Sequence, residues 1–204
     1  MKYIIKRAEP IGLDCARRHN LNWEKFRKSC HDLYDVCCDQ AREEQLGECA
    51  YTGMPLNSSA NIHIDHFKKK SIYPKLTFEW NNLFLAIKDN RYGADHKDRY
   101  IDGENAINSY FMLINPALDD PSKYFWYSNN GEVRPKDNLT EFDKQKASIT
   151  IDVFNLNNRV LLSRRRDLFE IIKCYQDLEE GDVLSSLEGY GFSFVIREFL
   201  WYLP

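Results

Sequence analysis

The segment Asn61-Ile62-His63-Ile64-Asp65-His66-Phe67 is the most informative part of this 204-residue sequence. It predicts a short strand that ends near His66, because a run of three lysines follows almost directly. The segment Trp80-Asn81-Asn82-Leu83-Phe84-Leu85 predicts a second strand over 83–87, and the polar residues 90–98 have room for about two helical turns. Together these elements predict a small ββα unit.

Helical patterns surround this unit on both sides. Residues 22–44 read as one long helix with Asn22 as its N-cap, and 125–134 reads as a hairpin with an Asn-Gly turn. The helical period returns from 105 onward, with interruptions at prolines, and it covers 140–154, 159–178 and 187–202. We therefore expect an α+β fold in one compact domain, 1–204. The ββα core of about 49–100 lies between a helical segment of about 1–48 and a helical region of about 101–204.

The composition excludes several classes of protein. An apolar fraction of 43% and a charged fraction of 29% are those of an ordinary soluble globular chain. No apolar run approaches the roughly 20 residues that span a bilayer, and the first residues do not resemble a secretory signal. We therefore expect a cytoplasmic protein with no membrane partner, whose six cysteines are free thiols.

The charge is unevenly distributed along the chain. The net charge is −3, yet residues 63–100 hold eight Lys or Arg against five Asp or Glu, and 164–166 is a run of three arginines. Residues 176–188, in contrast, hold five acids and no base. Local basic faces of this kind are what binding a polyanion at one site requires, although a basic run can also be a solvated helix face.

The first segment also contains the residue types that hydrolyse a phosphodiester. This reaction needs a base that deprotonates water and a cation held on the scissile phosphate. His66 is the candidate base, while Asp65 and Asn90 are candidate oxygen ligands for Mg²⁺. Neighbours in a regular strand point to opposite faces, so Asp65 and His66 serve one site only if the strand ends or bulges there.

Further polar residues near this segment are candidate functional residues, although each could also have a purely structural or surface role. His63 is a possible extra ligand or substrate contact, or simply a packed strand residue, and His96 is a possible phosphate contact or a surface residue. The basic neighbours are the candidate nucleic-acid contacts: Lys68, Lys69, Lys70, Arg91 and Lys97.

Taken in order, these motifs resemble those of the HNH endonucleases, and within them the PtuB family of Septu-type and retron-associated antiphage defence systems. The resemblance covers roughly 49–166. It rests on Cys49-Ala50-Tyr51, Ile64-Asp65-His66-Phe67, Tyr73-Pro74, Thr77-Phe78-Glu79-Trp80-Asn81-Asn82-Leu83, Asn115-Pro116, Asp119-Asp120-Pro121, and Leu156-Asn157 with Arg164.

The resemblance implies a role for each matched residue. His66 would be the general base, Asp65 and Asn90 would bind a divalent metal, Mg²⁺ or Mn²⁺, and Asn82 would stiffen the site. It also implies a partner, a PtuA-like ATPase that gates the nuclease.

The sequence departs from the family at three places. Relatives typically carry Cys-x-x-Cys pairs that bind a structural zinc, but here Thr52 stands where the second cysteine would be, so we expect that zinc to be absent. Lys69 replaces a usual proline, and the lysine common just after the helix-start Asn is missing near Tyr92 and Gly93.

Two classes of function follow from this sequence. The first is a metal-dependent HNH nuclease acting in antiviral defence, with DNA as the favoured nucleic-acid substrate and RNA, including transfer RNA, left open. The second is a catalytically inactive adaptor that docks on the ATPase. Its support is the missing zinc pairs, the acidic patch at 177–182 and the aromatic end at 199–203.

Overall fold

The centre of the molecule is a two-stranded antiparallel sheet followed by a helix. The computed structural model describes residues 1–57, 61–102, 109–175 and 178–200. Strand β1 (Ile62–His66) pairs with β2 (Leu83–Ile87) in a continuous register from Ile62↔Ile87 to His66↔Leu83, without a bulge. Helix α4 (Gly93–Tyr100) follows β2. The chain is therefore α+β, with the β-β-α order of elements that the sequence predicts.

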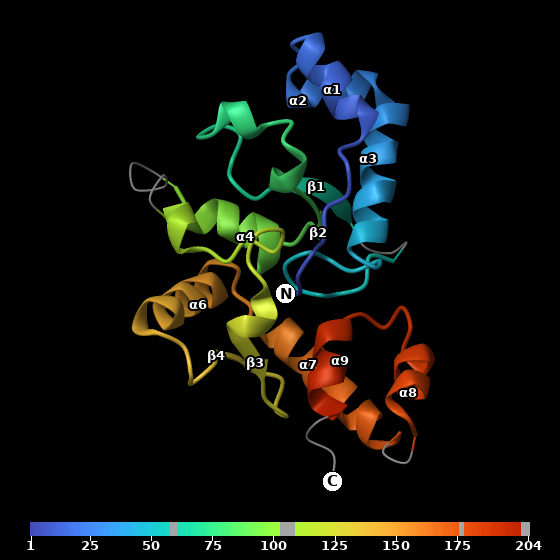
Figure 1. Cartoon of the computed structure of the whole chain (residues 1–204), viewed down its shortest axis with the longest axis vertical. Coiled ribbons are helices and arrows are strands. Elements are labelled where there is room, and N and C mark those ends of the chain that lie inside the picture. The colour runs from blue at the N-terminus through green and yellow to red at the C-terminus, as the bar shows by residue number, and fades with distance from the viewer. Residues whose placement is uncertain (58–60, 103–108, 176–177, 201–204) are drawn as a thin grey trace.

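Strand β2 is buried over its whole length, because helices cover it from two sides. Figure 1 shows the β1–β2 hairpin between α3 (His31–Glu44) and α4, and both helices contact β2. Gln45, the C-cap of α3, extends this contact with a pair of hydrogen bonds. Its side-chain amide donates to the carbonyl of Leu85 at 2.8 Å and accepts from the Leu85 N–H at 2.8 Å. A strand covered on both faces reads as a continuous apolar run, as 83–87 does.

The helix predicted over 22–44 is two helices in the structure. Helix α2 (Trp23–Ser29) and α3 are separated at Cys30, whose φ of −127° and ψ of 53° are not helical. The break allows α2 to turn its two aromatic residues inward, so that the Trp23 and Phe26 rings both pack on Phe78. The N-cap prediction is confirmed, because the Asn22 side chain accepts a hydrogen bond from the backbone N–H of Lys25 at 2.8 Å.

The C-terminal region contains four described α-helices and a second hairpin. The helices are α6 (Glu141–Val153), α7 (Arg159–Lys173), α8 (Glu180–Ser186) and α9 (Ser193–Leu200). Strands β3 (Phe125–Tyr127) and β4 (Val133–Pro135) form the predicted hairpin. Gly131 in its turn has φ +83° and lies so close to α7 that a Cβ would collide with the carbonyl oxygen of Leu162.

The amphipathic segment predicted over 187–202 is helical only in its second part, as α9. Helix α8 ends at Ser186 and α9 begins at Ser193. Between them Gly189 and Gly191 have φ values of +76° and +88°, which a helix cannot contain. The predictions that fall on 103–108, 176–177 and 201–204 lie outside the described residues.

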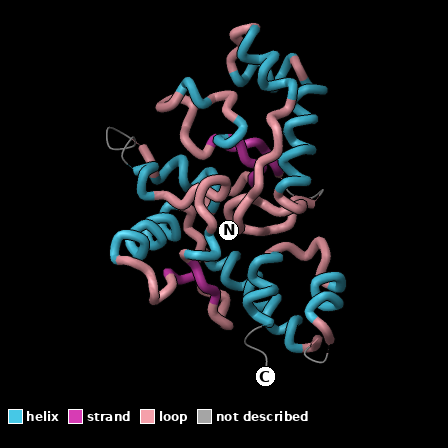
Figure 2. The backbone as a smooth tube through the Cα atoms, in the orientation of Figure 1, coloured by secondary structure: helices cyan, strands magenta, loops and turns pink. Residues whose placement is uncertain are grey.

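The remaining described helices are short. Helix α1 (Ile11–Arg18) precedes α2, and four 3₁₀ turns lie between the longer elements. These turns are η1 (Pro74–Leu76), η2 (Trp80–Asn82), η3 (Tyr110–Met112) and η4 (Pro121–Lys123). Figure 2 shows how much of the chain is helix and loop around the two small sheets. Within the part of the chain that the structure describes, no helix is both long enough and apolar enough to cross a membrane.

One apolar cluster contains residues from all three sequence segments. The Phe67 ring, just after β1, stacks on the Phe154 ring at the end of α6 with a centroid distance of 6.3 Å. At the N-terminal side, the Lys6 ammonium donates to the carbonyl of Leu83 at 2.7 Å, and the Ile4 N–H donates to the carbonyl of Pro116 at 2.8 Å. These contacts fix the first residues of the chain against β2 and against the segment at Pro116.

Candidate active site

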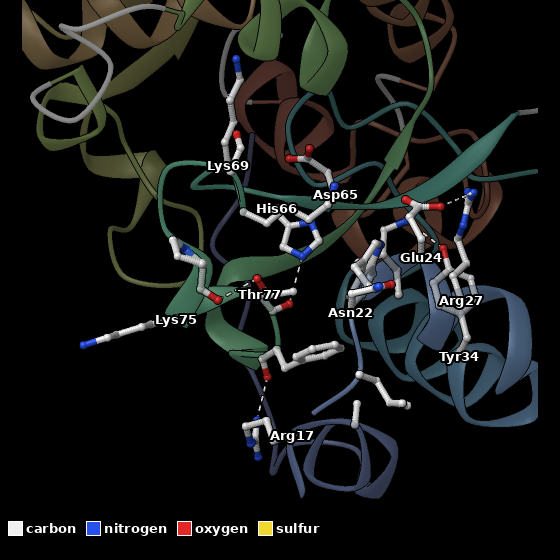
Figure 3. A pocket seen from close by; sticks show the side chains of 18 of the residues that line it. Arg17, Asn22, Glu24, Arg27, Tyr34, Asp65, His66, Lys69, Lys75 and Thr77 are labelled. Carbon is white, nitrogen blue, oxygen red and sulfur yellow. Dashed lines mark hydrogen bonds and ion pairs between the residues drawn. The ribbon is translucent and has the colours of Figure 1, made fainter. Parts of the chain in front are cut away.

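A cavity of about 890 Å³ opens beside the end of β1. One wall comes from α1 and α2, including Arg17 and Trp23, and the other comes from β1 and the loop after it, including His66 and Thr77. Figure 3 shows this arrangement, with Asn22 and the residues of α2 facing the His66 ring. The cavity therefore joins the N-terminal helices to the segment in which the sequence places the chemistry.

His66 is held in one orientation and kept uncharged. Its Nε2 lies 3.0 Å from the carbonyl oxygen of Thr77, and its ring meets Trp23 edge to face with centroids 4.5 Å apart. A carbonyl oxygen only accepts, so Nε2 carries the proton and Nδ1 keeps the free lone pair. Burial lowers the pKa of His66 to about 4, although the charge of Asp65 opposes the shift. At neutral pH the imidazole is therefore a neutral, oriented acceptor of protons.

The Asp65 carboxylate lies on the other side of β1 from the His66 ring, as Figure 3 shows. Because β1 is regular up to His66, the two neighbours keep the alternation of an ordinary strand. Asp65 is only 4% exposed, and its Oδ2 accepts from the hydroxyl of Tyr51 at 2.6 Å and from the ammonium of Lys97 at 2.8 Å. The carboxylate thus has two strong donors within the protein.

Lys97 reaches Asp65 from α4 and is completely buried. Its ammonium also donates to the backbone carbonyls of His66 at 2.6 Å and Phe67 at 3.1 Å, and lies 3.2 Å from the carboxylate of Asp98. Burial raises the pKa of Asp98, which Lys97 opposes. The sequence assigned Lys97 to nucleic acid, but its position makes it a buried support of the end of β1.

Asn82 ties together the loop that follows β1. Its amide nitrogen donates to the carbonyls of Lys68 and Leu76, each at 3.1 Å, and its oxygen accepts from the N–H of Lys68 at 2.8 Å. This loop carries Thr77, the partner of His66. Such an arrangement is what the proposed stiffening role of Asn82 requires.

Asn90 is not brought to the cavity. It is exposed in the turn before α4 and does not line the space beside His66. Asp65 pairs with Phe84 on β2. Ile87 lies three residues beyond Phe84, which is about 10 Å further along the strand at the usual rise per residue. Asn90 follows Ile87 at this far end of the hairpin, so the predicted ligand pair of Asp65 and Asn90 is not assembled.

The two remaining histidine candidates differ in position. His63 lines the cavity, and its Nε2 lies 3.9 Å from the Asp95 carboxylate. His96 does not line it: its Nδ1 is 2.8 Å from the carbonyl oxygen of Val153, on α6. The prediction of a phosphate contact at His96 therefore has no support from its position.

Only part of the predicted basic surface faces the cavity. Lys69 and Lys70 line it, but the Lys69 ammonium donates to the backbone carbonyls of Asp98 and Ile101. Lys68 does not line it and places its ammonium over the Tyr73 ring, 5.2 Å from the centroid. The exposed Arg91 is turned to Asp89, whose oxygens accept its N–H groups at 2.6 and 3.0 Å. Sequence proximity to the motif was thus a poor guide to which cations reach the cavity.

Several lining residues carry no local sequence signal. Arg17, Trp23 and Lys75 line the cavity, but two of them belong to helices more than 40 residues before His66. Lys70 and Lys75 are exposed at the rim, and no described carboxylate lies within 4.0 Å of either ammonium. Trp23 could have been identified only from the tertiary contact between α2 and the hairpin, and the spacing of residues along the chain does not predict that contact.

The described residues do not bring together the Asp65 and Asn90 side chains that the resemblance implies as metal ligands. Among them, no group of three or more His, Cys, Asp or Glu side chains is placed to hold a metal ion. Asp65 lines the cavity, but Oδ2 is committed to Tyr51 and Lys97, and Asn90 lies elsewhere. No catalytic step through Mg²⁺ or Mn²⁺ follows from this arrangement.

The fold and the cavity define an α+β chain with a buried, neutral histidine beside a cation-bearing rim, a site suited to acid–base chemistry. No protein-family model matches the sequence. The chain is 28% identical over 221 residues to Septu protein PtuB of Bacillus mycoides (strain KBAB4), in an alignment that covers 91% of this chain and 72% of that protein. This similarity supports a relationship to the Septu PtuB family.

A second, weaker similarity is to Septu protein PtuA of the same strain. The chain is 24% identical to it over 186 residues, which covers 70% of this chain and 24% of that protein. Both relatives thus carry Septu names.

Proposed function

We propose that this chain is a component of a Septu-type antiphage defence system and hydrolyses phosphodiester bonds of nucleic acid in the His66 cavity. The similarity to the Septu proteins supports the first part. The β-β-α order of elements, with the Asp65-His66 pair at the end of β1, supports an HNH-type nuclease for the second. A PtuA-like ATPase is the proposed partner.

The state of His66 is the observation that carries this proposal. A general base must be unprotonated at working pH and aimed at its proton donor. The Thr77 carbonyl fixes the tautomer, and burial under Trp23 keeps the ring neutral. The cavity beside the ring, with Lys70 and Lys75 exposed at its rim, leaves space for a negatively charged substrate.

The proposed step follows from this geometry. The imidazole of His66 takes a proton from a water molecule, whose oxygen forms a bond to phosphorus as the bond to the leaving oxygen breaks. That oxygen departs as an alkoxide with the electron pair of the broken bond and takes a proton from solvent water. Lys70 and Lys75 at the rim, which have no described acidic partner, are the proposed contacts for the negatively charged phosphates. DNA is the favoured substrate, and RNA is the alternative.

The test uses the purified chain together with a PtuA-like ATPase, offered plasmid DNA and total RNA. We expect cleavage of DNA, and we expect His66→Ala to reduce the rate by about 100-fold or more, the usual contribution of a general base. His19→Ala, at an exposed histidine, is the matched control. Degradation of RNA alone would replace DNA as the substrate, and equal rates for His66→Ala and wild type would refute the assignment of the base.

The second candidate function is an adaptor without catalysis. It is favoured by the commitment of Asp65 to Lys97 and by the position of Asn90 outside the cavity. A phage-protection assay separates the two functions. If the complex with His66→Ala protects cells as well as wild type does, the adaptor is correct and the nuclease is not.

A further inference from the structure

We infer that the cation beside Asp65 is the ammonium of Lys97, and that this chain binds no divalent metal at that carboxylate. The inference rests on the proposed function, since it names the cation of the same site. The inference also goes beyond the proposed function, because the protein itself supplies the positive charge that a divalent ion would bring to Asp65.

The surroundings of the Lys97 ammonium are those of a coordinated cation. Four oxygen atoms lie within 3.2 Å of it: the carbonyls of His66 and Phe67, and one carboxylate oxygen each from Asp65 and Asp98. Carboxylates and carbonyls are also the oxygen ligands that hard divalent cations take in proteins. An ammonium has three N–H donors, and these go to Asp65 and the two backbone carbonyls, so the Asp98 oxygen is an ion-pair partner without a hydrogen bond.

Burial keeps the ammonium in this position. Lys97 has no exposed surface, and Asp65 has almost none. A buried charge is stable only when it is paired and hydrogen-bonded, so a metal that drew Asp65 away would leave Lys97 unpaired inside the protein. The hydroxyl of Tyr51, also fully buried, holds the same carboxylate oxygen from a second direction.

The local charges already balance without a metal. Asp65 and Asp98 contribute two negative charges, and Lys97 neutralises one of them. The ammonium of Lys69 provides the second positive charge, because it donates to the backbone carbonyls of Asp98 and Ile101. A divalent ion would therefore add two positive charges to a cluster that already contains two ammonium groups.

Helix α4 brings a second carboxylate, that of Asp98, to the same ammonium, so Lys97 occupies the space between the two carboxylates. The residue one turn before Lys97 on the same face is Ala94, a buried side chain without a donor atom. Asn90, the predicted ligand, precedes the helix and is exposed. Asp65 is therefore a positioning residue in this inference: it holds Lys97 against the carbonyls at the end of β1, next to the base.

Manganese binding to the purified chain, followed by electron paramagnetic resonance, tests the inference without any measurement of activity. We expect wild-type protein and Asp65→Asn to bind Mn²⁺ equally, with no saturable site that depends on Asp65. Asp32→Asn, at an exposed carboxylate, is the matched control. The variant Lys97→Met removes the ammonium, and in a folded form it is expected to gain a Mn²⁺ site that depends on Asp65.

Each result decides the question. Saturable Mn²⁺ binding to wild type that is lost in Asp65→Asn would overturn the inference, and so would a folded Lys97→Met variant that gains no site. If Lys97→Met does not fold, as circular dichroism would show, the comparison of wild type with Asp65→Asn still decides.

A nuclease assay with and without EDTA distinguishes this inference from the proposed function. Cleavage that requires His66 and persists in EDTA supports both. Cleavage that requires His66 but stops in EDTA and returns with Mg²⁺ would overturn the inference and leave the nuclease standing. If no cleavage occurs under any condition, the nuclease fails, and the Mn²⁺ measurement alone decides the role of Lys97.

Discussion

Acid should destabilise this protein through one buried imidazole. His66 is 7% exposed, and burial lowers its pKa from 6.5 to about 4. Between these two values the unfolded chain binds a proton that the folded chain does not bind. The free energy of unfolding therefore falls as the pH falls through this window, and His66 makes no contribution to the pH dependence above it.

The two pKa values set the size of the effect. At pH 5 the unfolded imidazole is almost fully protonated and the folded one is mostly neutral, which corresponds to a loss of about 2 kcal/mol relative to pH 8. Other groups titrate over the same range, so the comparison must be made with a variant that lacks only this imidazole. His66→Gln is suitable, because its amide can still donate to the Thr77 carbonyl.

The measurement is urea unfolding of wild type and His66→Gln at pH 8 and pH 5. We expect the loss of stability on acidification to be smaller in the variant by about 2 kcal/mol, while His19→Gln behaves as wild type. If wild type and His66→Gln lose the same stability, or if nuclear magnetic resonance shows the imidazole of the folded protein titrating near 6.5, the reasoning about its burial is wrong.

Three other perturbations test further parts of the structure. Asn82→Ala removes three hydrogen bonds of the loop after β1 and should lower the free energy of unfolding in urea by about 2–3 kcal/mol. Asn81→Ala, at the exposed neighbour, should lower it by less than about 0.5 kcal/mol. Equal losses in the two variants would contradict the role given to Asn82. Gly131→Ala should lower the free energy of unfolding by more than about 3 kcal/mol, because a Cβ there collides with α7. Gly47→Ala, at a similar φ of +71° but with no atom within 4 Å of the added Cβ, should lower it by only about 1 kcal/mol. Equal melting temperatures of the two variants in thermal unfolding would contradict the predicted collision. The double variant Lys70→Gln, Lys75→Gln should lower the slope of log affinity for nucleic acid against log salt by about 2, measured by fluorescence anisotropy, and an unchanged slope would exclude these two lysines from the interface.

Local sequence signals predicted local structure well. The strands at 62–66 and 83–87, the Asn22 cap and the turn at Gly131 depend on patterns within a few residues, and all are present. The helix break at Cys30 has another cause: packing of the α2 aromatic rings on Phe78, almost 50 residues later in the chain. No pattern within 22–44 contains that information.

The candidate site was predictable only as far as single positions. The sequence identified His66 as a base candidate, and its environment suits that role. It placed Asn90 beside Asp65, but the β1–β2 register puts Asn90 at the opposite end of the hairpin and brings Lys97 to the carboxylate instead. Spacing along the chain does not show which residues of a helix will face a strand two elements earlier.

The cover that α2 provides for His66 limits how this site could be moved or divided. The β1–β2 hairpin and α4 form a contiguous β-β-α cassette of the chain that could be excised as a fragment. A fragment that begins after residue 48, however, would lack Trp23, whose ring packs on the imidazole. It would also lose Lys6 and Gln45, which bond to the backbone of β2. A transplant of the β-β-α cassette into another scaffold would thus carry the histidine without its dry surroundings, and the imidazole would titrate like one in water.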